Sequence, residues 1–318
     1  MPCKRRARAQ AAALLAVVGV LGATRASRGE LRAIWAVDDG TKVAADAPDQ
    51  PLARGNGVFT PRPAQVRLFG ARNEVVAFQL ILVGGRATTT EVRVRLPAVG
   101  PIVNGPLSDD PDRYFLGRRI ELFAQHYQHV RERSASLNWQ PGSAAEPRVP
   151  LGWLPDALVP LRTDAPLTVP AGRNQGVWVD LFLPPRTPPG RYRGTLTVEV
   201  GGQPCTLAGC RLPIELEVLP LTLPQQPSLR TMVYFSGSDD DRDVVVARYL
   251  PRPWEAPEAA VEALRARHFL LARRHRLTLF IGRDQAPTEV LRRQLSGEAF
   301  NRTAGYEGPG EGWAWTST

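Results

Sequence analysis

Residues 176–221 carry a hydrophobic pattern that predicts consecutive β-strands. In residues 177–183, valine and leucine occupy every second position, which is the period of a strand with one buried face. The same alternation returns in residues 192–200 and again in residues 212–218, with prolines and glycines between the runs. A meander of such strands is typical of the core of a β-sandwich.

The part of the chain before this meander has the same character. Short apolar runs alternate with connections rich in proline and glycine, and most of the 30 prolines fall in connections. We therefore expect one β-sandwich domain over residues 27–224, because strands that bury one face need a second sheet to cover them. The further strands that we expect are residues 31–37, 65–68, 74–83, 91–96 and 119–127.

The pattern changes after about residue 225. Residues 231–235 and 277–281 are continuous apolar runs, which is typical of parallel strands buried on both faces. Between them, an apolar stripe at helical spacing predicts a helix, and residues 288–295 predict another. We expect a mainly β protein in which the sandwich is followed by an incomplete α/β (TIM-like) barrel over residues 225–318. The stripe consists of Val261, Leu264, Leu271 and Ala272.

The first 26 residues have the pattern of an export signal. Four basic residues precede the apolar run 11–22, and small residues follow it at positions 24–26. The run is too short to span a bilayer comfortably, so we expect cleavage, a periplasmic or extracellular protein, and no stable membrane span afterwards. Cleavage would remove five basic residues and no acidic ones, which lowers the net charge from +9 to +4. The remaining charge is scattered and does not favour nucleic-acid binding.

The mature chain would keep two cysteines, Cys205 and Cys210. They flank a short connection between two expected strands, and an exported protein can hold them as a disulfide. A pair of free thiols is the alternative.

The histidines do not suggest a metal site. His126 and His129 are three residues apart on an expected strand, so their side chains point to opposite faces. His268 and His275 lie on the apolar stripe of the expected helix, where packing is the simpler interpretation. We therefore expect no metal site at these histidines.

Four phrases of the sequence, taken together, resemble glycoside hydrolase family 123 and its bacterial relatives. They are ARNEVVAFQLIL (71–82), GVWVDLFLPPRTPPGRYRGTLTV (176–198), LPIELEVLPLTLPQQPSLRTMVYF (212–235) and LSGEAFNRTAGYEGPGEG (295–312). The resemblance implies a β-sandwich followed by a TIM-like barrel that removes terminal N-acetylgalactosamine from glycans. It also implies a retaining, substrate-assisted mechanism without a metal or an organic cofactor. In that mechanism an adjacent Asp-Glu pair supplies the general acid and orients the 2-acetamido group.

This chain departs from the family at that pair. No Asp-Glu or Glu-Asp dipeptide occurs in the sequence, so no residue is assigned the acid role. We therefore expect the chain to be the N-terminal portion of such an enzyme. The whole enzyme would act on N-acetylhexosaminides, and this fragment would be inactive.

Two groups of residues are candidates for binding a glycan. Asp239 and Asp240 follow the first expected barrel strand, on the face where barrel enzymes bind substrate, although a solvated acidic loop or a cap for the next helix is the simpler interpretation. Trp139 and Trp153 lie in a long polar stretch, where they could stack on sugars or simply fix a loop. Trp178 alternates with apolar residues, and we expect it in the core. The alternative function is a non-catalytic carbohydrate-binding or interaction module.

Overall fold

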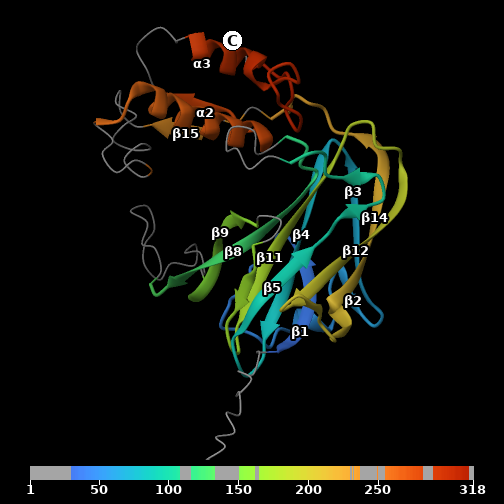
Figure 1. Ribbon diagram of the computed structural model, residues 1–318. Helices are drawn as coiled ribbons and strands as arrows, with labels where there is room; N and C mark the ends of the chain where they lie inside the picture. Colours follow the sequence, from blue (N-terminus) through green and yellow to red (C-terminus); the bar gives the residue numbers. More distant parts are fainter. Residues whose placement is uncertain are drawn as a thin grey trace, which may run out of the picture.

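The computed structural model describes residues 30–107, 116–132, 150–161, 165–229, 231, 233–236, 249, 255–281 and 289–314. The expected export signal, Trp139, Asp239 and Asp240 all fall outside these ranges. In the described part the chain is mainly β (Figure 1). No helix there has both the length and the apolar composition that crossing a bilayer requires.

A five-stranded antiparallel sheet forms one layer of the protein. Its central strand, β11, pairs with β4 on one side and with β8 on the other. The edges are β1 and β9. In spatial order the strands are β1 (Leu31–Asp38), β4 (Glu74–Gly84), β11 (Asn174–Leu183), β8 (Ile120–Val130) and β9 (Gly152–Pro160).

A nine-stranded sheet forms the second layer. Its main path is β10 (Leu167–Val169), β5 (Thr89–Arg95), β12 (Gly190–Val200), β14 (Arg211–Thr222), β3 (Ala64–Arg72) and β2 (Phe59–Pro61). The short strands β6 (Ala98–Val99), β7 (Ile102–Val103) and β13 (Gln203–Pro204) join it beside β12. The 3₁₀ helices η1 (Pro51–Arg54) and η2 (Ala208–Cys210) lie in connections.

The expected meander is divided between these layers. β11 belongs to the five-stranded sheet, whereas β12 and β14 pair with each other in the nine-stranded one. β14 also pairs in parallel with β3, far away in sequence. Period-two alternation identifies a strand and its buried face, but it carries no information about which strand is the neighbour.

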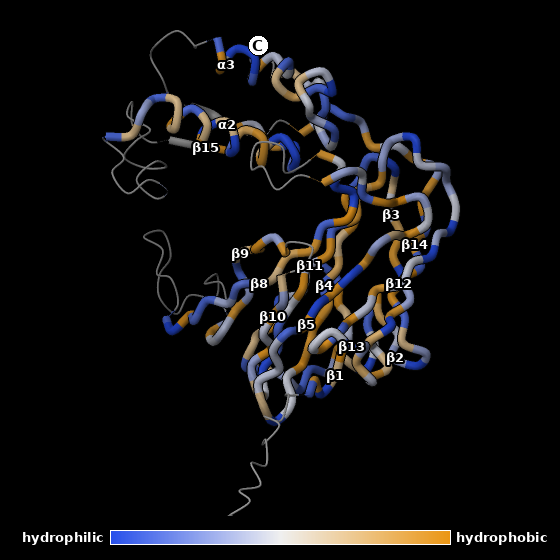
Figure 2. Tube along the Cα trace, in the orientation of Figure 1, coloured by the Kyte–Doolittle hydropathy of each residue, from blue (hydrophilic) through white to orange (hydrophobic). Residues whose placement is uncertain are grey.

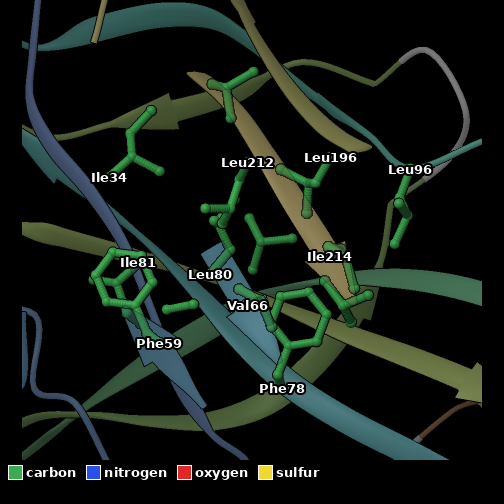
Figure 3. Packing of buried hydrophobic residues seen from close by; sticks show 14 of the residues in the cluster. Ile34, Phe59, Val66, Phe78, Leu80, Ile81, Leu96, Leu196, Leu212 and Ile214 are labelled. Carbon is green, nitrogen blue, oxygen red and sulfur yellow. The ribbon is translucent and has the colours of Figure 1, made fainter. Parts of the chain in front are cut away.

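The two sheets share one hydrophobic core, and we call them together the two-sheet unit. Val179 and Leu80 contribute from the five-stranded sheet, and Leu196, Leu212 and Ile214 contribute from the other. All five side chains are at most 1% exposed. Figure 3 shows part of this cluster, and Figure 2 shows the hydrophobic stretches along β4 and β11. Removing this apolar surface from water is the main stabilising term.

A smaller helical lobe follows the two-sheet unit. It contains β15 (Val233–Ser236), α2 (Glu258–Arg274), β16 (Leu279–Ile281), α3 (Glu289–Ser296) and the 3₁₀ helix η5 (Glu298–Phe300). β15 and β16 pair in parallel, as the sequence predicts. In the described residues this sheet has two strands, so a barrel is not observed. Figure 1 shows α2 and α3 at one end of the two-sheet unit.

The buried face of α2 differs from the predicted stripe. Val261 and Ala272 are buried as expected, but Leu271 is 49% exposed. Arg265 and Arg273 are buried in its place. The guanidinium of Arg273 lies over the rings of Phe300 and Trp313 and donates to backbone carbonyls, so an arginine here serves as a packing residue, which hydrophobicity alone does not reveal.

Cys205 and Cys210 form a disulfide in the structure, with Cα atoms 5.6 Å apart. The bridge lies at η2, where Gly209 packs directly against Ile34 of β1. A Cβ atom at residue 209 would lie 2.6 Å from the Cβ of Ile34, so only glycine fits at this position. The disulfide connection therefore lies against the edge strand of the five-stranded sheet.

Candidate functional site

A cleft of about 930 Å³ lies between the outer face of the five-stranded sheet and the C-terminal end of α2. Its floor comes from β4, β8 and β11, and its opposite wall comes from α2 and the residues that follow it. We call it the sheet–helix cleft. Because both walls include charged and apolar side chains, it is the strongest candidate site in the described part of the chain.

The floor follows from strand alternation. On β11, Val177, Val179 and Leu181 point into the core, so Trp178 and Asp180 point outward into the cleft. The sequence interpretation placed Trp178 in the core, and the structure corrects this. Trp178 lies on the opposite face of the strand from the buried valines, and it is only partly buried.

Three carboxylates contribute to the cleft. Asp180 lies opposite Ala77 of β4 on one side and opposite Glu121 of β8 on the other. Asp38, the last residue of β1, pairs with Phe78, and Asp39 follows it as an exposed turn residue. Asp39, Asp180 and Glu121 all line the cleft.

Asp180 is held by its neighbour on the same strand. The indole Nε1 of Trp178 donates to Asp180 Oδ1 at 2.7 Å. Burial raises the pKa of Asp180 to about 6, while the Trp178 hydrogen bond opposes this rise. The nearby charge of Glu121 raises this pKa further, that of Arg274 lowers it, and that of Asp39 raises it. The carboxyl therefore titrates near neutral pH.

Glu121 is paired across the cleft with Arg274 of α2. Their side chains are 3% and 13% exposed, so this is a buried ion pair that joins the helical lobe to the sheet. The second oxygen of Glu121, Oε1, is buried and has no hydrogen-bond partner. Close by, Arg276 donates to the backbone carbonyl of Asn73. Burial lowers the pKa of Arg276.

The wall formed by α2 is partly apolar. Leu271 faces the cleft, and Leu158 of β9 lines its other side. His275 follows α2 at the same wall, and its pKa is lowered by burial and by the positive charge of Arg274, so the neutral imidazole is favoured. A ligand that fits here would combine an apolar face with polar edges.

A network of amides lies on the same outer face of the sheet, beside the cleft floor. Gln125 Nε2 donates to Gln79 Oε1 at 2.6 Å, and Gln79 Nε2 donates to the carbonyls of Asp38 and Thr41. The hydroxyl of Tyr127 accepts from the backbone N–H of Gly176 at 3.0 Å, and burial raises its pKa to about 12. These bonds fix the turn that carries Asp39.

The sequence-predicted tryptophan Trp153 lies outside the cleft. The sequence interpretation placed it in a loop, but it is in the edge strand β9, where proline is tolerated because one side of the strand is unpaired. Its ring stacks on His129, with centroids 4.7 Å apart and planes within 3°. The Arg173 guanidinium lies 5.2 Å from the ring centroid. A sugar would therefore compete with side chains already at the ring.

The residues that form the site were missed by sequence reasoning. None of Asp39, Asp180, Glu121 and Arg274 was among the candidate site residues of the sequence analysis. One signal was present, because Asp180 is a charged residue inside an otherwise apolar strand. The described residues contain no group of three or more side chains that could hold a metal ion.

The chain has structural neighbours among solved proteins. No protein-family model and no curated protein matches the chain. A family 123 glycoside hydrolase from Clostridium perfringens is structurally similar, with 12% identity and a TM-score of 0.48 over 77% of this chain. The matched part is 35% of that enzyme, so this chain spans about a third of its length.

Two other solved structures are less similar. AvmM, which catalyses macrocyclization in alchivemycin A biosynthesis, has 15% identity and a TM-score of 0.23, covering 49% of this chain and 87% of that one. A putative membrane anchored protein from Corynebacterium diphtheriae has 15% identity and a TM-score of 0.23, covering 50% of this chain and 33% of that one.

Proposed function

We propose that the chain is the N-terminal portion of an exported glycoside hydrolase acting on N-acetylhexosaminides, and that the sheet–helix cleft holds the glycan. The observation that carries this proposal is the pair Trp178 and Asp180 on the cleft floor, with the indole fixed by its hydrogen bond to the carboxylate. An aromatic ring beside a carboxylate suits a sugar, which presents an apolar face and hydroxyl edges.

The order of elements supports the proposal. Two sheets with a shared core, followed by β15, α2, β16 and α3, agree with a β-sandwich over residues 27–224 and the start of a barrel over residues 225–318. The four sequence phrases that resemble family 123 come from both parts. Export through the signal at residues 1–26 would bring the protein to extracellular or periplasmic glycans.

The proposed role of this chain is to bind the glycan. Hydrolysis requires catalytic residues that this chain does not supply. The family's acid and its acetamido-orienting partner form an Asp-Glu pair that this sequence lacks. Asp180 and Glu121 line the cleft, but Glu121 is held in an ion pair with Arg274. The substrate-assisted, cofactor-free mechanism is therefore proposed for the parent enzyme only. We expect no cleavage of an aryl N-acetylgalactosaminide by this chain above background.

The test is calorimetric titration of an N-acetylhexosamine oligosaccharide into residues 27–318. Trp178→Ala removes the aromatic surface, and the apolar contact of one sugar face with one ring is worth roughly tenfold in affinity. We expect at least about a tenfold loss for this variant. Trp153→Ala is the matched control and should bind as the parent does.

The reverse result would favour the alternative function. If Trp153→Ala weakens binding and Trp178→Ala does not, the glycan is held on the outer end of β8 and β9, as a carbohydrate-binding module would hold it. Absence of binding by the parent chain to any N-acetylhexosamine oligosaccharide would contradict the proposed function itself.

A further inference from the structure

We propose that the sheet–helix cleft binds a chain of at least two sugar residues, and that this chain lies across the strands of the floor. It would rest on a row of three rings, which are Trp178 of β11, Phe123 of β8 and Pro160 of β9. We call these three side chains the ring row. The inference rests on the proposed function, because it specifies the length and the direction of the glycan in the same cleft.

Strand register places the ring row on one face of the sheet. Trp178 lies directly opposite Phe123 in the β11–β8 pair, and Phe123 lies directly opposite Pro160 in the β8–β9 pair. Residues that are directly opposite in an antiparallel pair share a face, and all three residues line the cleft. Because neighbouring strands are about 4.8 Å apart, the backbones at the two ends of the ring row are about 10 Å apart.

The ring row is an apolar surface that the described residues leave partly uncovered. Phe123 is half-buried and Pro160 is exposed, although the outer face of an antiparallel sheet is usually polar. The apolar side chains around them do not close over the row, because Leu271 on the opposite wall is 49% exposed and Leu158 on β9 is 39% exposed. An uncovered apolar surface with polar borders is typical of a binding site.

Polar groups lie along one side of the ring row. Asp180 is two residues beyond Trp178 on β11, and therefore lies on the same face about 7 Å away. Its partner across the β11–β8 pair is Glu121, which forms an ion pair with Arg274 of α2. The floor thus has rings on one side and charged groups on the other. A sugar chain has the same division, because it has apolar ring faces and edges of hydroxyl groups.

The direction of the chain follows from this arrangement. The rings and the charged groups both follow one another across the strands, so a glycan that matches both must also run from β11 toward β9. A pyranose is similar in size to a six-membered aromatic ring, so one sugar covers Trp178 and the next covers Phe123. The cleft volume of about 930 Å³ is near the upper end of the range of about 300–1,000 Å³ for pockets that hold drug-sized ligands, which leaves room for more than one sugar.

The experiment is calorimetric titration of N-acetylglucosamine and of its β-linked disaccharide into residues 27–318. We expect the disaccharide to bind at least about tenfold more tightly, because it adds the apolar contact with Phe123. A second sugar without a binding position of its own would raise the affinity by only about twofold, because it doubles the ways of occupying one position.

Two variants test the second ring. Phe123→Ala and Phe123→Leu both remove the flat ring, and the leucine variant keeps an apolar side chain of similar volume at this half-buried position. We expect the ratio of disaccharide to monosaccharide affinity to fall to about twofold in both. Phe69→Ala is the matched control, because it removes a ring that is 71% exposed on β3 of the nine-stranded sheet, and it should keep the parent ratio.

The outcomes separate the two proposals. If the parent ratio is no more than about twofold, the ring row is overturned and glycan binding in the cleft stands. The same holds if both Phe123 variants are folded by circular dichroism and keep the parent ratio. A ratio that also falls in Phe69→Ala would show that the gain does not come from the cleft, and would overturn the ring row. If neither sugar binds, the proposed function fails together with the ring row.

Discussion

Asp180 stands on the outward side of a strand whose inward side is completely buried. Its pKa is raised to about 6, chiefly by burial, from an ordinary value of 3.8. The folded protein therefore holds this proton between pH 4 and 6, where the unfolded chain has released it. Stability contributed by the protonated form is present below pH 4 and is lost as the pH rises through 6.

Replacement of Asp180 tests this linkage. Asp180→Asn keeps an acceptor for the Trp178 indole and removes the buried charge. We expect the variant to be more stable than the parent by about 1–2 kcal/mol at pH 7.5, and equal to it near pH 3.5. The free energy of unfolding in urea at the two pH values measures the difference. An equal change at both pH values would contradict a titrating Asp180.

Some features of individual residues could be predicted from the sequence, and others could not. The valines of β11 show which alternate positions face the core. The outward position of Trp178 and Asp180 could therefore be predicted from the sequence. The partnership of Glu121 with Arg274 was not, because the two residues are 153 positions apart. Hydrophobic periodicity is local, whereas an ion pair between elements depends on how they pack.

At the scale of elements, strands are predicted well and their partners are not. β1, β4, β8, β12 and β14 overlap the expected runs, because each has one buried face. The passage of β11 to the other sheet, and the parallel pairing of β14 with β3, depend on long-range packing. The strand β9 was missed because Pro155 and Pro160 resemble loop residues.

The buried ion pair between α2 and β8 gives a prediction at this scale. Arg274→Ala leaves Glu121 buried without its counter-charge, and breaking such a pair costs about 3–5 kcal/mol. Hydrogen exchange should show lost protection in α2. The double variant Glu121→Gln with Arg274→Met should recover most of it, because no charge is left buried.

A matched control is available on α3. Arg292 and Glu289 form an exposed pair at 3.9 Å, and Arg292→Ala should change stability by less than about 1 kcal/mol. If Arg274→Ala is no more damaging than this control, the lobe is not attached to the sheet through the Glu121–Arg274 pair.

The described residues of the molecule form a large core and a small one. The two-sheet unit has a continuous core drawn from both layers, whereas the buried core of the helical lobe is Phe269, Ala272, Leu279, Phe300 and Tyr306. Small cores bury too little apolar surface to be very stable alone. In the described residues, the polar bonds that join the lobe to the unit include the Glu121–Arg274 pair and Gly310 N–H to Gln225 Oε1 at 3.1 Å.

Limited proteolysis tests whether the helical lobe is less stable than the two-sheet unit. Residues 27–318 should yield a resistant fragment that ends between about residues 220 and 230, because the lobe opens more readily than the two-sheet unit. Mass spectrometry of the fragments locates the cut. If residues 230–318 resist protease as part of a soluble monomer, the lobe has a closed core of its own and is not the start of a larger barrel.

The most direct test of the central claim follows the tryptophan indole N–H signals by nuclear magnetic resonance while an N-acetylhexosamine oligosaccharide is added to residues 27–318. The Nε1–H of Trp178 is bonded to Asp180 on the cleft floor, so a glycan in the cleft must change its environment. We predict a saturable shift of the Trp178 signal with the Trp153 signal unchanged. A shift confined to Trp153, or no shift at saturating glycan, would contradict glycan binding in the sheet–helix cleft.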